Sequence, residues 1–331
     1  MLFSDRRLFL AGSSASLCLL ASTSSRAAPL TKTSFLLDVL ANPKHALFYP
    51  AVANGYFNMA NLDVRIEAGK GSADVVQKVA SGAFAFGFAD ASAVVLGRSR
   101  GIQLKLIAMV HYKPLMTIIT REEARVQKPA DLAGKKIAST SGDAVRAVFP
   151  AVARLNQVDA SAVNFVTVDQ AAKSALLIAG QVDGVCDYLS AFPIYKAAAA
   201  KNGFQLNSLL FANFGLDIYS NGIVATDDLI ENQKPLVANF MSAVRESMRY
   251  AVNHRNETAD IFRRYFSQYD DEVTREGLDI AVDHLMVAEA KGDQLGRMTD
   301  EKMEKTIATT RETYGFQSAV RPSDVYTNAF C

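Results

Sequence analysis

The feature that most constrains the fold is a regular alternation of short apolar runs with segments of helical periodicity. Strands are predicted at residues 34–40, 62–67, 84–90, 103–112, 135–140, 163–168 and 182–188. Helices are predicted between them at residues 44–55, 72–80, 91–101, 141–155, 170–180 and 191–203. Strands that alternate with helices form mostly parallel sheets covered by helices. The alternation therefore predicts an α/β fold.

Two weak copies of one pattern divide this α/β chain into two lobes. The sequences VASGAFAFGFADASA (79–93) and LIAGQVDGVCDYLSA (177–191) each run helix, glycine turn, strand, aspartate and Ser-Ala. The chain is expected to cross between lobes near 112–116 and near 221–226, with a hinge and a ligand cleft between the lobes. Residues 28–113 plus 225–331 are predicted to form lobe 1, and residues 114–224 lobe 2. Helices predicted at 228–269, 272–291 and 300–314 are expected to pack on lobe 1.

The first 27 residues are expected to be an export signal outside the fold. Arg6 and Arg7 precede an apolar stretch, and Ser25-Arg26-Ala27 fits cleavage before Ala28. The DRRLFL run is similar to a twin-arginine signal, with an ordinary secretion signal as the alternative. The apolar stretch is too short and too rich in serine for a membrane span. We therefore expect an exported, soluble, periplasmic protein.

The composition argues against several kinds of partner and cofactor. The net charge is +1, and positive and negative residues are dispersed along the chain. We therefore expect no positive electrostatic potential strong enough to hold a nucleic acid or an acidic membrane. The four histidines and three cysteines show no metal-ligand spacing, and no G-x-S-x-G or Ser-His-acid pattern stands out. The sequence predicts no cofactor, no metal site and no catalytic residue.

Polar and small residues follow the predicted strands where a binding site is expected, because ligands of open α/β sheets lie at the carboxyl ends of the strands. In lobe 1 the candidates are Asp38, Asn42, Pro43, His45, Gly71, Ser72, Asp90 and Ser92. In lobe 2 and at the first crossing they are Ser141, Gly142, Asp187, Tyr188 and Tyr112. Asp143 either contacts the ligand or caps its helix.

The turn Gly69-Lys70-Gly71-Ser72 looks at first like a phosphate-binding loop. A Walker loop carries its lysine after the second glycine of G-x-x-x-x-G-K-[ST], whereas Lys70 lies between two glycines. A dinucleotide fingerprint needs a third glycine where this chain has Asp74. Both nucleotide motifs fail. The turn is expected to offer free amides and Ser72 to an oxygen-rich group, with a plain capped turn as the alternative.

Three aspartates set the expected chemistry of the ligand. Asp38, Asp90 and Asp187 accept hydrogen bonds when ionised, so they favour a cation or a ligand with amino or ring N–H donors over nitrate or a sulfonate. Asp38 lies in an apolar run and needs a partner, either a protein donor or the ligand. The preference would reverse if basic side chains turned inward, namely Lys44, Lys70 and Arg146.

Several stretches of the chain together resemble a known family. They are LLDVLANPKHALFYPAVANGYFNMANLDVRI, GKGS, SGAFAFGFADAS, KPADLAGKKIA and VYTNAF. The chain resembles the solute-binding proteins of ABC importers that carry nitrate, sulfonates, taurine and thiamine-precursor pyrimidines. This resemblance implies a two-lobed periplasmic-binding-protein fold of type II with two hinge strands. It also implies a monomer that delivers a small molecule to a permease in the inner membrane.

The run LD…NPKH is most similar to the pyrimidine-precursor branch of that family. That branch carries a large aromatic residue where this chain has Val39 and Leu40, and the chain contains no tryptophan. The aromatic residue that stacks on a ligand must then be another one: Tyr49, Tyr112, Tyr188 or Tyr219. The resemblance carries ligand contacts over to Asp38, residues 42–45, Gly71-Ser72, Asp90, Ser141-Gly142 and Asp187-Tyr188.

The expected function is that of an extracytoplasmic binding protein that closes on a small polar or heteroaromatic ligand. The preferred ligand is a thiamine-precursor pyrimidine or a related amine-bearing ring, and the alternatives are a sulfonate, taurine, nitrate or an aromatic carboxylate. Two further hypotheses are an enzyme similar to the fungal pyrimidine-precursor synthases, with its histidine near His45, and a sensor that feeds a membrane receptor.

Overall fold

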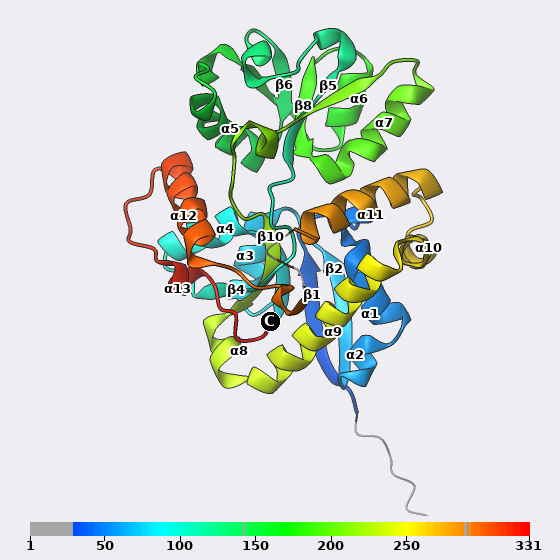
Figure 1. Ribbon diagram of the computed structural model, residues 1–331, viewed down its shortest axis with the longest axis vertical. Helices are drawn as coiled ribbons and strands as arrows, with labels where there is room; N and C mark the ends of the chain where they lie inside the picture. The colour runs from blue at the N-terminus through cyan, green and yellow to red at the C-terminus, as the bar shows by residue number, and fades with distance from the viewer. Residues whose placement is uncertain (1–28, 142, 288–289, 291) are drawn as a thin grey trace, which may run out of the picture.

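The computed structural model describes residues 29–141, 143–287, 290 and 292–331, which form two lobes around two five-stranded sheets (Figure 1). The expected export signal and Gly142 lie outside the described residues. The first sheet has the order β2 (Leu62–Ala68), β1 (Thr31–Leu37), β3 (Phe86–Asp90), β10 (Asn221–Thr226) and β4 (Leu104–Met109). The second has the order β7 (Asn164–Thr167), β6 (Lys136–Ser139), β8 (Gly184–Tyr188), β5 (Met116–Arg121) and β9 (Leu206–Leu210).

Each sheet contains one strand that runs opposite to its neighbours. Strand β10 pairs antiparallel with β3 and β4, and β5 pairs antiparallel with β8 and β9, while the other pairs are parallel. In both sheets this strand is second from an edge, and the chain enters it directly after crossing from the other lobe. The predicted α/β fold with two hinge connections is confirmed.

The two crossings between the lobes lie at residues 110–115 and 215–220. The first agrees with the expected position. The second precedes the expected one, because residues 221–226 already form β10 of the first sheet. The lobe boundary expected after residue 224 therefore falls inside a strand, and residues 221–224 belong with lobe 1.

Two of the predicted helices are divided, and a proline lies at one break in each. Residues 43–53 form the 3-10 helix η1 (Pro43–Phe48) and then α1 (Tyr49–Ala53), with Pro50 in the first turn of α1. The expected helix at 228–269 is divided into α8 (Asp227–Asn232), α9 (Lys234–Asn253) and α10 (Arg255–Tyr265), and Pro235 lies in the first turn of α9. Proline is accommodated in a first turn because that turn's N–H has no helical partner.

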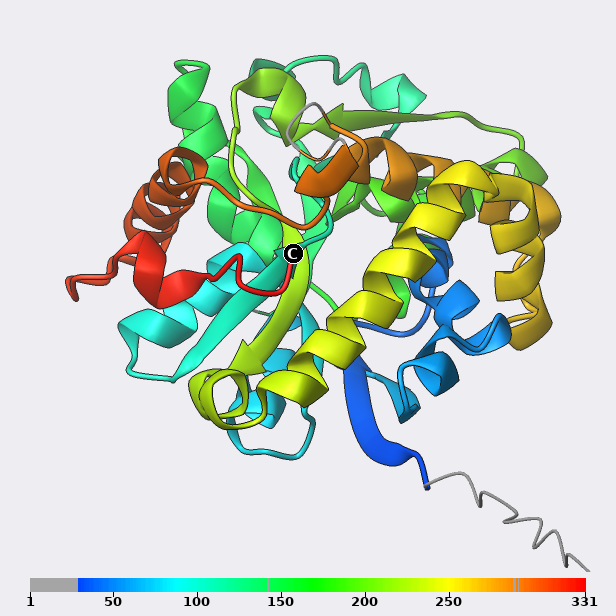
Figure 2. The same cartoon turned by 60° about the horizontal axis from the view of Figure 1, so that its bottom comes forward.

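The remaining helices cover the sheets and link the lobes. They are α2 (Tyr56–Met59), α3 (Ser72–Ala80), α4 (Ala91–Ser99), α5 (Ala144–Leu155), α6 (Ala172–Ile178), α7 (Phe192–Lys201), α11 (Asp271–Leu285), α12 (Asp300–Tyr314) and α13 (Pro322–Val325). In the C-terminal part, α11 packs against α7 and against η5 (Leu189–Ala191), and α12 packs against α5 (Figures 1 and 2). These helices join the first lobe to the second outside the two crossings.

The core of lobe 1 is rich in aromatic side chains. Phe35, Phe48, Phe86 and Phe88 are fully buried, and the ring of Phe86 stacks on that of Phe240 at a centroid distance of 3.8 Å. Such rings bury a large apolar area and dominate core energetics. Phe88 also lies edge-on to the ring of His45 at the sheet edge, with 5.6 Å between centroids. Within the described part of the chain, no helix has the length and hydropathy that a bilayer crossing requires.

Candidate functional site

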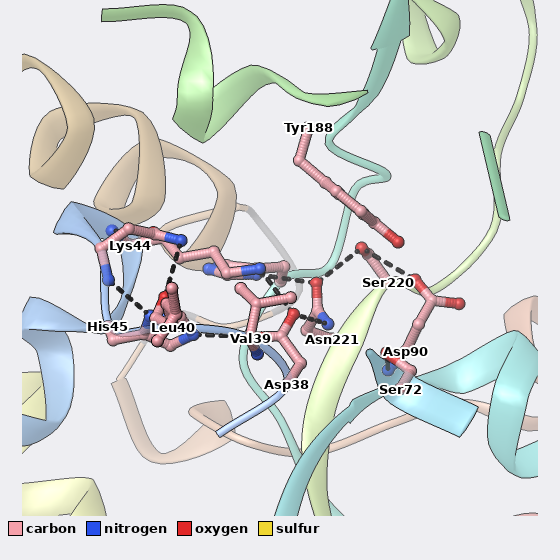
Figure 3. A network of polar contacts seen from close by, with 12 residues as sticks. Asp38, Val39, Leu40, Lys44, His45, Ser72, Asp90, Tyr188, Ser220 and Asn221 are labelled. Atoms are coloured by element: carbon pink, nitrogen blue, oxygen red, sulfur yellow. Dashed lines mark hydrogen bonds and ion pairs between the residues drawn. The ribbon is translucent and has the colours of Figure 1, made fainter. Parts of the chain in front are cut away.

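Polar side chains gather at the edge of the first sheet that faces the second lobe (Figure 3). Asp38 follows β1, Asp90 ends β3 and His111 follows β4. Asn221 begins β10, and because that strand is antiparallel its start lies at the same edge as the ends of its neighbours. The sequence prediction considered only residues that follow strands, so it found Asp38 and Asp90 and missed Asn221.

Asp38 is held in a buried cluster with two neighbours from η1. Its carboxylate lies 2.6 Å from the Lys44 ammonium and 2.7 Å from His45 Nε2. Burial alone would raise the pKa of Asp38, but the charge of Lys44 and the hydrogen bond from His45 hold that pKa well below its usual range. Asp38 is therefore an ionised carboxylate whose charge is balanced within the protein.

The hydrogen bonds of His45 define its protonation state. Its Nδ1 accepts a hydrogen bond from the backbone N–H of Asn42 at 3.1 Å, so the proton of the neutral ring lies on Nε2 and is donated to Asp38. Burial lowers the pKa of His45, although Asp38 opposes this. Both ring nitrogens have protein partners, so His45 positions Asp38.

Asp90 has the opposite environment. It is buried, caps α4 by accepting a hydrogen bond from Ser92 N at 2.9 Å, and accepts another from Ser220 Oγ at 3.3 Å. No lysine, arginine or histidine of the described residues forms an ion pair with it. Burial raises the pKa of Asp90, and the nearby charge of Asp38 adds to this effect. Asp90 is a buried acceptor without a cation.

The Gly69–Ser72 turn supports the two aspartates. Gly71 has φ +110° and donates its N–H to the backbone oxygen of Asp38 at 2.6 Å. Ser72 Oγ accepts the N–H of Asp90 at 3.0 Å, and Lys70 N is bonded to Asp74. The expectation of free amides is wrong for Lys70 and Gly71, because both N–H groups donate to other residues of the protein, Asp74 and Asp38. Gly71 and Ser72 hold the aspartates in place.

Tyr188, at the end of β8, brings the second lobe to this cluster (Figure 3). Its ring lies over the Lys44 ammonium at 5.0 Å from the centroid, the geometry of a cation–π contact. Burial raises the pKa of the Tyr188 hydroxyl, and the charges of Asp90 and Asp38 raise it further. A ligand of Asp90 would thus lie close to a tyrosine of the opposite lobe.

The other candidates of lobe 2 have different surroundings. Asp187 accepts hydrogen bonds from the Tyr195 hydroxyl at 2.9 Å and from Tyr188 N at 2.8 Å, so it is engaged within its own lobe. Asp143 caps α5 and forms an ion pair of 3.1 Å with the buried Lys173. Ser141 is exposed. The parallel between Asp90 and Asp187 in the sequence does not extend to their environments.

Several tyrosines considered for stacking belong to the core. Tyr112 and Tyr219 are almost fully buried, with their rings 6.0 Å apart, and their hydroxyls accept the N–H groups of Gly296 and Thr299. Tyr49 packs among Phe262 and its neighbours. The expectation that Tyr112 and Tyr219 line the site is therefore corrected, because both rings are enclosed between lobe 1 and its C-terminal segment.

Asn42 and Pro43 shape the loop that carries Lys44 and His45. Asn42 caps η1 by accepting a hydrogen bond from Lys44 N, and Pro43 occupies the first turn. Pro43 also lies against Gly277 of α11, where an added Cβ would come within 2.6 Å of its ring. The neighbouring Lys44 is buried. Lys70 and Arg146, the other basic residues considered, are exposed.

The site offers acceptors more readily than free cationic donors. Lys44 is a buried cation at this edge, and its ammonium is bonded to Asp38, whereas Asp90 carries no such partner among the described residues. Within the same residues, no group of three or more histidine, cysteine or acidic side chains is placed to hold a metal ion. The arrangement suits a ligand that donates hydrogen bonds.

The fold and site define the class of protein. The structure superposes on an alkanesulfonate-binding protein from Xanthomonas axonopodis pv. citri with a TM-score of 0.69, at 14% identity over 91% of this chain and 99% of that one. It superposes on the periplasmic aliphatic sulphonate-binding protein of Escherichia coli with a TM-score of 0.67, at 13% identity over 90% and 91% of the two chains. The chain has the periplasmic-binding-protein fold.

Sequence comparison identifies the family within that class. Residues 42–258 match the family described as NMT1/THI5 like, and the chain belongs to it. The chain is 23% identical over 235 residues to a formylaminopyrimidine-binding protein of Halalkalibacterium halodurans, covering 70% of each. It is 26% identical over 239 residues to a putative thiamine biosynthesis protein of Haemophilus influenzae, covering 71% of this chain and 73% of the other.

Proposed function

We propose that this protein is the extracytoplasmic solute-binding component of an ABC importer and that its ligand is an amine-bearing heteroaromatic ring, such as an aminopyrimidine. The observation that carries the proposal is the environment of Asp90, a buried carboxyl group that has hydrogen-bond donors but no cation among the described residues. A ligand amine or ring N–H would supply the missing charge-assisted donor. The name of the Halalkalibacterium halodurans relative supports the same ligand class.

The charges at the sheet edge that holds Asp38 and Asp90 disfavour an anionic ligand. A sulfonate or nitrate needs converging donors, but the ammonium of Lys44 lies 2.6 Å from Asp38 and balances its charge. An anion would also approach Asp90 without a compensating cation, which is costly in a buried site. A ring with amino donors meets neither difficulty, and the Tyr188 ring of the opposite lobe offers it an aromatic contact.

Binding between the lobes would couple ligand capture to closure. Tyr188 belongs to the second sheet and Asp90 to the first, so a ligand that contacts both stabilises the closed arrangement through contacts that an open one lacks. Delivery to a permease then requires the lobes to separate again. The two crossings at residues 110–115 and 215–220 are the segments where the backbone would rotate.

A thermal-shift and calorimetric screen tests the proposal. The probes are 4-amino-2-methylpyrimidine, methanesulfonate, nitrate and benzoate, each titrated into the mature chain. At about 100 times its dissociation constant, a bound ligand raises the free energy of unfolding by about 2.7 kcal/mol. We expect the aminopyrimidine to stabilise the wild type and to lose this effect in Asp90→Asn, which keeps the helix cap. Stabilisation by methanesulfonate, nitrate or benzoate instead would contradict the proposed ligand class.

A further inference from the structure

His111 is a fully buried histidine at the first crossing, and none of the side-chain contacts described above involves it. Its backbone is bonded to the end of the second crossing and to the start of β10. His111 N donates to the backbone oxygen of Asn221 at 2.8 Å, and the backbone oxygen of His111 accepts Ser220 N at 3.1 Å. Its ring lies edge-on to Phe88 at 5.6 Å between centroids, and Phe88 also contacts His45 in this way. His111 therefore belongs to the sheet edge that holds Asp38 and Asp90.

The contacts of Asn221 define which nitrogen of His111 carries the proton. Asn221 Nδ2 donates to Asp38 at 3.3 Å, so its Oδ1 is the acceptor that lies 3.5 Å from His111 Nδ1. Burial and the charge of Lys44 lower the pKa of His111 well below its usual value, so the ring is neutral. With its proton on Nδ1, the ring presents Nε2 as an acceptor.

This acceptor has no hydrogen-bond partner among the described residues, although His111 is fully buried. Buried polar atoms are nearly always hydrogen-bonded, because an unmade bond costs about 1–3 kcal/mol. This unpaired acceptor, at the sheet edge that holds Asp38 and Asp90, indicates that a molecule other than the protein completes the bonding.

We propose that His111 Nε2 accepts a hydrogen bond from the ligand's amino group, and that His111 thereby selects ligands that present donors both to it and to Asp90. This assignment rests on the proposed function and names the group that discriminates among ring ligands. A site that hydrogen-bonds a ligand N–H rejects analogues without that group, because its own buried acceptor is then left unpaired. Asn221 acts as a positioning residue, since it orients the imidazole and ties it to Asp38.

Two ligands and two substitutions test the assignment by calorimetry. The ligands are 4-amino-2-methylpyrimidine and 2,4-dimethylpyrimidine, in which a methyl group of similar size replaces the amino group. His111→Asn keeps a donor near the Nδ1 position but removes the Nε2 acceptor, whereas His111→Gln places an amide oxygen near the Nε2 position. We expect the wild type to prefer the amino ligand by about tenfold or more, His111→Asn to lose most of that preference, and His111→Gln to recover part of it.

The outcomes separate this assignment from the proposed function. If the wild type prefers the amino ligand and His111→Asn keeps the full preference, His111 does not read the amino group and the assignment is wrong. If the wild type binds neither pyrimidine, the proposed ligand class is wrong and the assignment falls with it. Melting curves of both variants identify a folding defect, and a folded His111→Gln with the same loss as His111→Asn also overturns the assignment.

Discussion

At the scale of single residues, the site is defined by two aspartates at neighbouring strand ends with opposite environments. Asp38 has an ammonium and an imidazole within 2.7 Å, and its pKa is lowered. Asp90 has only neutral donors, and its pKa is raised by burial. The difference between a balanced and an unbalanced buried charge comes from the direction in which Lys44 points. We therefore expect Asp38 to stabilise the folded protein, and we propose Asp90 as the contact for the ligand.

The first prediction concerns stability. Because the pKa of Asp90 is raised in the folded state, the folded protein holds an extra proton above the unfolded pKa of about 3.9, and its stability falls as pH rises through this window. Asp90→Asn removes that penalty and keeps the cap of α4. We expect the variant to be more stable than the wild type by about 1–2 kcal/mol at pH 7, with the difference vanishing near pH 4, as measured by urea unfolding.

Asp187→Asn is the matched control for this prediction. Asp187 occupies the corresponding position in the second lobe but is bonded to the Tyr195 hydroxyl, so its substitution should give no stabilisation at pH 7. A loss of stability in Asp90→Asn that persists at pH 7 would show that the ionised carboxylate is favourable where it lies.

At the scale of elements, α11 is the helix that joins the loop of Lys44 to the second lobe. It packs against η1 on one side and against η5 and α7 on the other. The close approach requires Gly277, where a Cβ would lie 2.6 Å from Pro43 Cβ and 3.6 Å from the oxygen of Ser190. The periodicity of residues 272–291 predicts a helix, observed as Asp271–Leu285, but says nothing of this contact, because the facing residues come from distant parts of the chain.

The second prediction follows from that contact. Gly277→Ala should favour helix formation by up to about 1 kcal/mol, but the proline ring cannot rotate away from the added methyl group. We expect overpacking to exceed this gain and to destabilise the protein by about 1–2 kcal/mol net, measured by urea unfolding. Glu276→Ala, on the same helix, breaks an exposed ion pair with Lys196 and should cost less than about 1 kcal/mol. Equal effects of both substitutions would argue against steric conflict at Gly277.

At the scale of the whole molecule, the two lobes are in contact on both sides of the crossings. Lys196 of α7 lies 3.0 Å from Glu276 of α11, and Arg154 of α5 pairs with Glu312 of α12. The cation–π contact between Lys44 and Tyr188 also joins the two lobes (Figure 3). We expect a ligand to reach Asp90 only when these contacts open.

The third prediction tests this requirement for opening. Lys196→Cys combined with Glu276→Cys, joined by a short bismaleimide, should hold the lobes together and slow ligand association by about tenfold or more in stopped flow. Burial raises the pKa of the thiols of Cys186 and Cys331, that of Cys331 to about 11, so the reagent should react with the introduced cysteines in preference to these two. The uncrosslinked double variant is the control. Unchanged association after crosslinking would mean that the ligand reaches its site without separation of the lobes.

The sequence by itself determined the α/β class, the two lobes and the sheet edge at which Asp38 and Asp90 gather. These properties follow from local periodicity and from the rule that ligand residues follow parallel strands. Only the tertiary structure decided that Lys44 balances Asp38, that Asp90 lacks a cation, that Tyr112 and Tyr219 are core residues, and that Asn221 and His111 join the edge. The reason is that these states depend on contacts between remote segments, such as the bond between Asn221 and Asp38 across 183 positions, and no local pattern records such a distance.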